Sequence, residues 1–354
     1  MSKITSRAYG RVNLIGEHTD YNGGWVLPTT IPQYTEIIFE KTEGNQVTLE
    51  SSNERKFSYA LGEEKRTGNW MDYLQGGTSI LQQFLKEKNQ KISGFIAHIT
   101  STIPEGSGLS SSAALEMSLL KGLKELFKLT INDIELARIG QRIENEFVGA
   151  RVGIMDQMAT SLAQSGEALY LDTLKLTYER IPLPMDKMDL LVINSGISHK
   201  LSASDGGYNQ RRAECEEACA KLGIKLLREI SLADLKRHHL PNVLMRRARH
   251  VVTENERVHA AVKAIKEQNL EQLGRLFIES HLSMRDDYEV SIPEIDLLVN
   301  LCLVDENVYG ARLTGGGFGG SIVALASKGH KEEIARKVIA RYFEETGEKA
   351  VLLA

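Results

Sequence analysis

Hydrophobic positions along the chain follow two different spacings, which predict strands in some segments and helices in others. Residues 94–99 alternate between apolar and polar side chains, as expected of a strand. From Leu115 to Phe127, apolar residues recur every three or four positions, the spacing of a helix with one buried face. A second helix is predicted over 132–148, and a third begins near Met155. From residue 209 to residue 305 the pattern is mainly helical.

The segment 104–116 joins the strand at 94–99 to the helix after it and is rich in glycine and serine. Gly106 and Gly108 allow a close backbone approach and a positive φ, and the first N–H groups of the helix are unpaired at the positive end of its dipole. The hydroxyls of Ser110–Ser112 can reach a phosphate or a hydrated Mg²⁺. No Gly-Lys-Ser/Thr of a Walker loop follows. Two interpretations therefore stay open, a phosphate-binding loop and an ordinary helix cap with a mobile loop.

A polar cluster lies between two strand-like segments near the N-terminus. Val12–Ile15 and Trp25–Leu27 are strand-like, and Asn22-Gly23 between them is a strong hairpin signal. The loop carries two carboxylates, an imidazole and a phenol, at Glu17, Asp20, His18 and Tyr21. A carboxylate can accept hydrogen bonds from two neighbouring hydroxyls, which is what a sugar diol offers. We interpret the loop as a ligand-binding element rather than a polar hairpin tip that faces water.

Two carboxylates further along the chain, Glu144 and Asp156, are candidate functional residues. Glu144 lies beside the apolar stripe of the helix predicted over 132–148, where the alternative is plain solvent exposure. Asp156 falls in the first turn of the next helix, where the helix dipole stabilises a negative charge by about 0.3–1 kcal/mol. It is therefore either a base beside a ligand or a common dipole-stabilising residue. Tyr208 is either a packed aromatic residue, which the sequence alone favours, or a ligand contact.

The last glycine-rich motif, at 313–321, satisfies G-x-G-x-x-G through Gly315, Gly317 and Gly320. In a dinucleotide-binding fold such glycines open a helix, but residues 322–326 are uniformly apolar and predict a buried strand. The context argues against a dinucleotide site and for a strand–loop–strand element beside another site.

Length and composition fit a globular protein of two domains. The chain has 354 residues, 42% of them hydrophobic and 25% charged. Prolines and turns follow a strand-like segment near 172–184, so the predicted domains are 1–172 and 173–354. A formal net charge of −4 argues against a nucleic-acid surface, and the one dense basic run, Arg246–His250, is interpreted as a solvated helix face.

Cysteine usage and the absence of long apolar runs indicate where the protein works. The three cysteines make no disulfide framework, and Cys215 and Cys219 lack the second ligand pair that a zinc site needs. No apolar run at the N-terminus suits a signal peptide, and no stretch approaches the length of a membrane span. We therefore expect a cytoplasmic protein with no membrane partner and no nucleic-acid partner.

Three of these motifs, in this order, resemble those of one known family. Residues 8–28, with the run Gly-Glu-His-Thr-Asp-Tyr-Asn, are similar to the galactokinase signature. Residues 104–113 resemble the ATP loop of the GHMP small-molecule kinases, and 313–321 resemble their third motif. The resemblance continues between the motifs and covers essentially the whole chain. It implies an α/β (α+β) fold of two domains, the first resembling domain 2 of ribosomal protein S5, with the active site in the cleft between them.

The resemblance also implies a reaction and residues that carry it. The reaction is Mg²⁺-dependent transfer of the γ-phosphoryl group of ATP to the C1 hydroxyl of D-galactose, which gives galactose 1-phosphate and ADP. The implied catalytic pair is Arg11 and Asp156. The implied sugar contacts are Glu17, His18, Thr19, Asp20, Gly153 and Tyr208. The implied ATP-binding residues are Gly106, Ser107, Gly108, Leu109, Ser110, Ser111 and Ser112, and the implied Mg²⁺ ligands are Ser112 and Glu144.

Two positions depart from the usual pattern of the family. Tyr9 stands where the family usually has proline, and residues 202–207 differ from the usual Ser-Glu-Tyr that ends at Tyr208. Two alternatives therefore stay open: a GHMP kinase for a related sugar, such as N-acetylgalactosamine or a uronic acid, and a sugar- and ATP-binding sensor without catalysis. The presence of both Arg11 and Asp156 argues against the sensor. The expected partners are a small sugar and ATP, and the expected state is a monomer.

Overall fold

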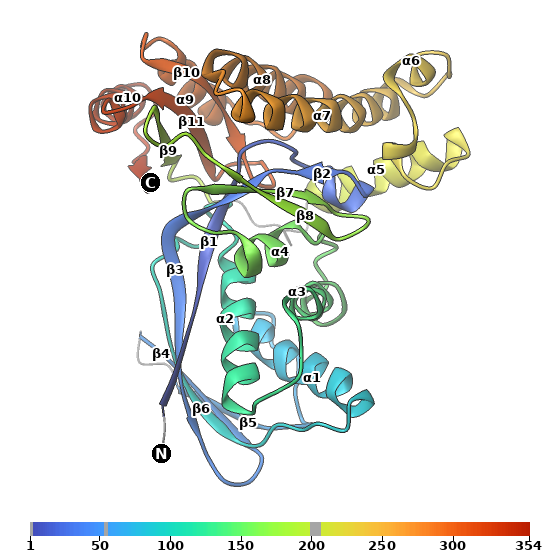
Figure 1. The fold of residues 1–354 in the computed structure, drawn as a ribbon, viewed down its shortest axis with the longest axis vertical. Helices are drawn as coiled ribbons and strands as arrows, with labels where there is room; N and C mark the ends of the chain where they lie inside the picture. The colour runs from blue at the N-terminus through green and yellow to red at the C-terminus, as the bar shows by residue number, and fades with distance from the viewer. Residues whose placement is uncertain (1–2, 53–55, 199–206) are drawn as a thin grey trace. The chain divides into compact units, whose positions relative to one another are not determined.

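The computed structural model describes residues 3–52, 56–198 and 207–354. The chain forms two compact units, whose elements are labelled in Figure 1. Unit 1 consists of Met1–Gly10, Ile31–Pro104 and Ser110–Leu162, and unit 2 consists of Arg11–Thr30, Glu105–Leu109 and Ala163–Ala354. Two short segments of the N-terminal half therefore belong to unit 2. The division into domains at residue 172 stays a prediction.

A five-stranded sheet forms one layer of unit 1. Its strands lie in the order β1 (Lys3–Asn13), β3 (Pro28–Lys41), β6 (Phe95–Ser101), β4 (Gln46–Ser51) and β5 (Lys56–Ala60). One side of the sheet is covered by helices, α1 (Met71–Glu87), α2 (Ser111–Leu126), α3 (Asp133–Arg142) and α4 (Met155–Leu162) (Figure 1). Gly122 lets α2 pack closely on the sheet, because a side chain at this position would run into the ring of Phe39.

Unit 2 contains two small sheets and six α-helices among its described residues. One sheet has the order β10 (Val308–Thr314), β11 (Ser321–Ser327), β9 (Met188–Asn194) and β12 (Val351–Leu352). The other has the order β2 (Trp25–Val26), β7 (Glu167–Asp172) and β8 (Thr177–Pro182). The helices are α5 (Gly207–Leu222), α6 (Leu232–Leu235), α7 (Asn242–Lys266), α8 (Leu270–Ser283), α9 (Pro293–Leu303) and α10 (Lys331–Thr346), with a 3-10 turn at η3 (Leu227–Glu229). Both α8 and α9 pack on β10, and α7 packs on α8.

Most of the predicted elements are present, and two differ in form. The helix predicted over 132–148 is α-helical only to Arg142 and continues as a π-helix, η2 (Ile143–Val148). The predicted turn at Asn22-Gly23 ends a 3-10 helix, η1 (Asp20–Asn22), in which Gly23 takes the left-handed conformation. The strand predicted at 322–326 is β11, so the glycine motif connects two strands, as expected. A second π-helix, η4 (Met284–Tyr288), follows α8 and had no sequence signal.

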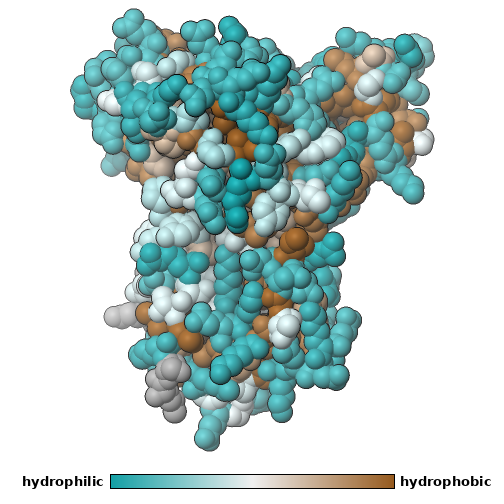
Figure 2. Space-filling view, viewed as in Figure 1, coloured by the Kyte–Doolittle hydropathy of each residue, from teal (hydrophilic) through white to brown (hydrophobic). Residues whose placement is uncertain are grey.

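Hydrophilic side chains cover most of the face shown in Figure 2, and hydrophobic side chains show around α5 and α6. In the described parts of the chain, no helix combines the length and the apolar character that crossing a bilayer requires.

The prediction that Arg246–His250 forms a solvated helix face is wrong. Arg247, in α7, is only 2% exposed. Its guanidinium donates to the carboxylates of Glu214 and Glu289, each at 2.6 Å, and to the backbone carbonyl of Asp287. The prediction failed because these acceptors come from α5 and from the end of η4, far from α7 in the sequence. The run therefore contains a buried guanidinium whose ion pairs and hydrogen bonds join α7 to α5 and to the end of η4.

Replacing the buried guanidinium of Arg247 should destabilise the folded protein. We expect Arg247→Ala to lower the free energy of unfolding by roughly 3 kcal/mol, because it removes a buried guanidinium that pairs with Glu214 and Glu289 and donates to the backbone of Asp287. The matched control is Arg237→Ala, since the Arg237 side chain is 78% exposed and pairs with Asp234 on the surface. It should change the free energy by less than about 0.5 kcal/mol. Chemical denaturation measures both variants, and equal effects would contradict the structural role of Arg247.

Candidate active site

The first part of the loop predicted to bind phosphate, Glu105–Leu109, belongs to unit 2. Gly106 and Gly108 have φ values of 66° and 74°, in the left-handed region that glycine adopts without strain. Ser107 and Leu109 are 2% and 1% exposed. Successive residues of the loop therefore alternate between glycines with unusual backbone angles and side chains packed inside the protein.

The third glycine-rich motif contacts this loop backbone to backbone. A Cβ atom on Gly315 would lie 2.6 Å from the backbone oxygen of Gly108, and Gly315 itself has a φ of 88°. The Ser321 hydroxyl donates a hydrogen bond to the backbone oxygen of Ser107 at 2.8 Å. Close approach and the positive φ together explain why glycine occupies position 315. The motif thus supports the predicted phosphate loop, as its strand–loop–strand context suggested.

Arg11 is anchored to the same loop. Its backbone N–H donates to the backbone oxygen of Leu109 at 3.2 Å, and its Nη1 donates to the backbone oxygen of Gly108 at 2.6 Å. The residue is 4% exposed. A fixed guanidinium therefore lies at the backbone of a glycine-rich loop, and guanidinium groups are well suited to recognise phosphate.

Glu17 and Arg312 form a buried ion pair in unit 2, with Oε2 and Nη2 2.6 Å apart and side chains 1% and 0% exposed. Oε2 of Glu17 also accepts from the Asn13 side chain at 2.8 Å. Oε1 accepts from the Thr314 hydroxyl at 3.2 Å and from the Gly315 N–H at 2.9 Å. Both carboxylate oxygens are thus engaged by protein donors. The ion pair attaches the polar loop near the N-terminus to the glycine-rich motif.

The rest of the polar loop is not a hairpin tip that faces water. His18 and Thr19 are 4% and 0% exposed, and Asp20 is partly exposed. The Thr19 hydroxyl donates to the backbone oxygens of Gly16 and Trp25, at 2.8 and 2.7 Å. These bonds close the loop on itself, and the binding of a ligand by this loop stays a prediction.

Three tyrosines surround His18 within unit 2. The ring centroids of Tyr21, Tyr208 and Tyr288 lie 5.9, 5.4 and 4.7 Å from that of His18. The structure therefore brings together two predicted sugar contacts, His18 and Tyr208, from segments far apart in sequence. Burial, with the charge of Arg211 and the nearby His250 ring, lowers the pKa of His18 to about 3, so the imidazole is neutral at neutral pH.

Ser112 and Glu144, the predicted metal ligands, lie together in unit 1. The Ser112 hydroxyl donates to Oε1 of Glu144 at 3.1 Å, and Glu144 is 2% exposed, so it is not a solvated helical residue. The Gln157 side-chain amide donates to Glu144 and to Glu116, at 3.2 Å each. Burial, with the charge of Glu144, raises the pKa of Glu116 well above its usual range, which favours the protonated acid there.

This donor set fits a magnesium ion. A hydroxyl and a carboxylate are oxygen ligands, and Mg²⁺ is usually bound through one or two protein carboxylates plus substrate phosphates rather than in a protein cage. Among the described residues, no group of three or more His, Cys, Asp or Glu side chains is placed to hold a metal ion. Asp156 lies in the first turn of α4, as predicted, and Gly153 is buried shortly before it.

Sequence reasoning missed four residues that shape these clusters, Arg312, Tyr288, Gln157 and Glu116. Only Arg312 could have been found from the sequence. It is a charged residue in the mainly apolar strand β10, and a buried charge needs a partner. Nothing in the sequence around the others indicated their role. Of the departures from the family pattern, residues 202–206 lie outside the described part of the chain.

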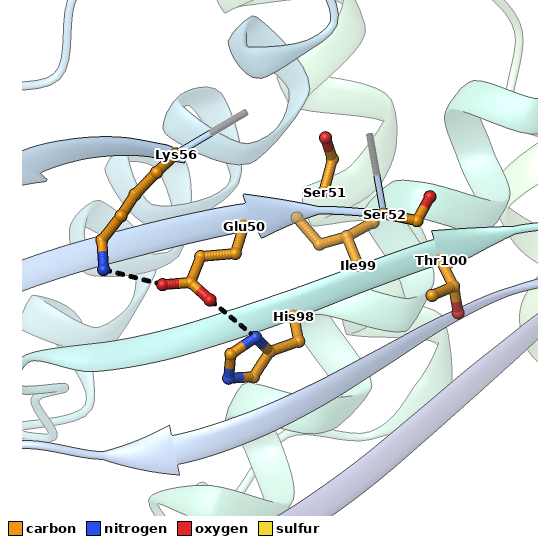
Figure 3. Close-up of a pocket in the computed structure, with 7 residues that line it drawn as sticks. All are labelled: Glu50, Ser51, Ser52, Lys56, His98, Ile99 and Thr100. Atoms are coloured by element: carbon orange, nitrogen blue, oxygen red, sulfur yellow. Dashed lines mark ion pairs between the residues drawn. The ribbon is translucent and has the colours of Figure 1, made fainter. Parts of the chain in front are cut away.

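A separate hollow of about 390 Å³ lies on the sheet of unit 1. In it, Glu50 lies between Lys56 and His98, 2.8 and 2.9 Å away (Figure 3). The side chains of Lys56 and His98 are 65% and 40% exposed. None of the predicted site residues lines this hollow, so it plays no part in the candidate site.

Three family descriptions match the chain. "GHMP kinases N terminal domain" matches residues 74–164, and "GHMP kinases C terminal" matches residues 261–345. "Galactokinase galactose-binding signature" matches residues 2–41, which include the polar loop.

Named relatives and solved structures agree with these matches. The chain is 40% identical over 336 residues to a galactokinase of Thermotoga neapolitana, covering 95% of this chain and 93% of the relative. It is 40% identical over 355 residues to a galactokinase of Haemophilus influenzae, covering 98% and 91%. The crystal structure of Lactococcus lactis galactokinase complexed with galactose matches with a TM-score of 0.93 and 35% identity, over 99% of this chain and 92% of that one. Methanococcus jannaschii mevalonate kinase matches at a TM-score of 0.70 and 18% identity, over 99% and 98%, which bears on the fold alone.

The contact between the two glycine-rich loops can be tested with a pair of matched variants. Gly315 and Gly329 have φ values of 88° and 91°, but a Cβ on Gly329 would meet nothing within 4 Å. Alanine should cost both sites roughly 1–2 kcal/mol of backbone strain. Only Gly315→Ala should also displace the loop at Gly108, and we expect it to raise the KM for ATP at least tenfold. Steady-state kinetics compare the two, and equal KM values for ATP would contradict the proposed support.

Proposed function

This chain belongs to the galactokinase family of the GHMP kinases, and we propose that it transfers the γ-phosphoryl group of ATP to the C1 hydroxyl of D-galactose. Membership of the family confirms the predicted α/β fold of the GHMP kinases and makes the chain an enzyme of the kinase class. The products would be galactose 1-phosphate and ADP. The monomeric state and the cytoplasmic location stay predictions.

The observation that carries this proposal is the attachment of Arg11 to the glycine-rich loop. Phosphoryl transfer proceeds through a loose transition state, so catalysis depends mainly on positioning and on stabilising charge. Arg11 donates to the backbone of Gly108 and Leu109, so its charge is held at the loop that we propose to bind the phosphates of ATP. A charge fixed in advance costs no reorganisation during the reaction.

The proposed phosphate-binding residues are those of the loop and of the start of α2. They are Gly106, Ser107, Gly108, Leu109, Ser110, Ser111 and Ser112. The two glycines bring backbone N–H groups close to the ligand, and the serine hydroxyls add further donors. We propose that Arg11 stabilises the charge that spreads over the transferred phosphoryl group.

Asp156 is the proposed base. Its carboxylate would orient the C1 hydroxyl of the sugar and accept the proton as the oxygen attacks phosphorus. Such a base typically contributes about 10²–10⁴-fold to the rate. We propose His18, Thr19, Asp20, Gly153 and Tyr208 as sugar contacts. Glu17 completes the proposed set, although both of its carboxylate oxygens already accept hydrogen bonds from the protein.

Mg²⁺ would be held by Ser112 and Glu144, together with phosphate oxygens. When bound, it supplies positive charge that offsets the charge of the triphosphate. The contribution of this chain is to hold the Glu144 carboxylate in place through the Ser112 hydroxyl and the Gln157 amide.

Replacing the proposed base should lower turnover and leave nucleotide binding intact. We expect Asp156→Asn to lower kcat by roughly 10²–10⁴-fold with little change in the Kd for ATP. The matched control is Asp133→Asn, because Asp133 also lies in the first turn of a helix, α3, but its side chain is 50% exposed. It should turn over at nearly the normal rate. Near-normal turnover in Asp156→Asn would contradict the assignment of the base.

Release of ADP from purified protein and Mg-ATP, measured against a panel of sugars headed by D-galactose, tests the substrate. Strong galactose-dependent release supports the proposal. Release only with N-acetylgalactosamine or a uronic acid keeps the kinase and replaces its substrate. Sugar binding without release for any member of the panel would favour the sensor.

A further inference from the structure

The guanidinium of Arg228, in η3, contacts parts of unit 2 that are far apart in the sequence. Its Nη1 and Nη2 atoms pair with the two carboxylate oxygens of Asp172, at 2.7 and 3.1 Å. Nη1 also donates to the backbone oxygen of Gly23, in the polar loop. The guanidinium carbon lies 3.8 Å from the centre of the Trp25 ring. One side chain therefore joins the polar loop to β2 and to the end of β7, and none of the proposed catalytic steps uses it.

The pairing of β2 with β7 explains why an arginine suits this position. Trp25 and Asp172 lie directly opposite each other on these antiparallel strands, so their side chains project from the same face of the sheet. A planar guanidinium can bind both oxygens of a carboxylate and offer its flat face to an aromatic ring, whereas a lysine ammonium has neither the fork nor the face. The Arg228 and Asp172 side chains are each 9% exposed, so water screens their attraction only weakly.

The backbone oxygen that Arg228 binds belongs to the turn that carries Asp20, a proposed sugar contact. Asp20 begins η1, and Gly23 follows this helix in the left-handed conformation. The Gly23 N–H donates to the backbone oxygen of Asp20 at 3.1 Å. The Thr173 hydroxyl donates to the same oxygen at 3.1 Å and to the backbone oxygen of Gly24 at 2.8 Å. The backbone of the turn is therefore fastened to the end of β7 by Thr173 and to η3 by Arg228.

The arginine extends from a fixed base, and the loop is shaped to receive it. Leu227, next to Arg228 in η3, is 0% exposed within the hydrophobic core of unit 2, and η3 packs on α7. A Cβ atom on Gly23 would lie 2.7 Å from the Leu226 side chain and 3.4 Å from Cδ of Arg228. Gly23 is buried, so without Arg228 its backbone oxygen would lose a charged donor that exposure to water does not replace.

We propose that Arg228 is a positioning residue for sugar binding, which holds the end of the polar loop in place and, through the turn at Gly23, places Asp20. The inference rests on the proposed function, because it takes Asp20 to contact a sugar. The ion pair of Glu17 and Arg312 attaches the start of the same loop to the glycine-rich motif. Arg228 holds the other end through contacts that include no residue of the proposed phosphate loop, so its loss should weaken the binding of sugar and leave that of ATP unchanged.

Steady-state kinetics separate a positioning role from a general loss of stability. We expect Arg228→Ala to raise the KM for galactose about tenfold, with kcat within about threefold and the KM for ATP unchanged. The matched control is Val338→Ala, because Val338 is 3% exposed in α10, which packs on α9 and β9. It should destabilise the protein and change neither KM. If Arg228→Ala does not fold, Arg228→Lys keeps the charge without the fork and should raise the KM for galactose alone.

Chemical rescue with free guanidinium tests whether the missing group itself positions the loop. The chain has two tryptophans, so in a Trp70→Phe background the emission reports on the Trp25 ring that Arg228 covers. We expect Arg228→Ala to shift this emission, and guanidinium chloride at low millimolar concentration to reverse both the shift and the rise in the KM for galactose. Sodium chloride at equal ionic strength should reverse neither. Recovery of the emission without recovery of KM would overturn the inference, because the filled site would then not act on the sugar.

The unmodified protein, measured in parallel, separates failure of this inference from failure of the proposed function. If it releases ADP with galactose, an unchanged KM for galactose in a folded Arg228 variant, or an equal rise in both KM values, contradicts the positioning role alone. If it releases ADP only with another sugar of the panel, the same comparison with that sugar decides the role of Arg228. Absence of ADP release with every sugar would overturn the proposed function, and with it the inference.

Discussion

The buried ion pair between Glu17 and Arg312 is the interaction on which the candidate site of unit 2 depends. The Arg312 guanidinium donates to Glu17 at 2.6 Å and to the backbone oxygens of Asn13 and Leu14, at 3.0 and 2.9 Å. Neither charged side chain reaches solvent. Removing one partner of such a pair leaves the other charge buried and typically costs 3–5 kcal/mol, so the two residues must be kept together.

A second buried acid, Glu254, lies near this ion pair. Glu254 accepts from the Gly16 N–H at 2.9 Å and from the Ser280 hydroxyl at 2.6 Å, so it holds the start of the polar loop against α7 and α8. Burial works to raise the pKa of Glu254, but Arg257, His250 and Arg312 outweigh it and hold the pKa at about 2. The polar loop is thus held by two buried acids, Glu17 and Glu254.

The Glu17 carboxylate is also connected to the proposed phosphate loop, through Gly315. Glu17 accepts from the Gly315 N–H, Gly315 lies against the backbone of Gly108, and Arg11 donates to the same Gly108 oxygen. The sugar-binding loop and the phosphate loop that we propose are therefore parts of one hydrogen-bonded assembly. A change at Glu17 can alter the geometry at either loop without touching a ligand.

Local features of this assembly could be predicted from the sequence, and its long-range pairs could not. The glycines of 104–116 and 313–321 and the first-turn position of Asp156 depend on neighbouring residues, so spacing alone predicted them. The partner of Glu17 lies 295 residues away, on β10, and no local pattern joins the two. Arg247 was misjudged for the same reason, because a basic run looks solvated until its acids are placed.

The aromatic side chains around His18 show the same limit in another form. Tyr21 and Tyr288 are 267 residues apart, and Tyr288 ends a π-helix that the apolar spacing did not indicate. The family resemblance supplied candidates such as His18 and Tyr208, and the structure brought their rings together. What the structure added was the set of aromatic neighbours that surround His18.

The most direct test of the central role of the ion pair is a double-mutant cycle of Glu17→Gln and Arg312→Met, with the KM for ATP and the KM for galactose measured in each variant. If the pair holds both loops, each single variant raises both KM values, and the double variant raises them by less than the product of the single effects. If Glu17→Gln raises only the KM for galactose and Arg312→Met changes neither, then Glu17 acts on the sugar alone and the ion pair does not support the site.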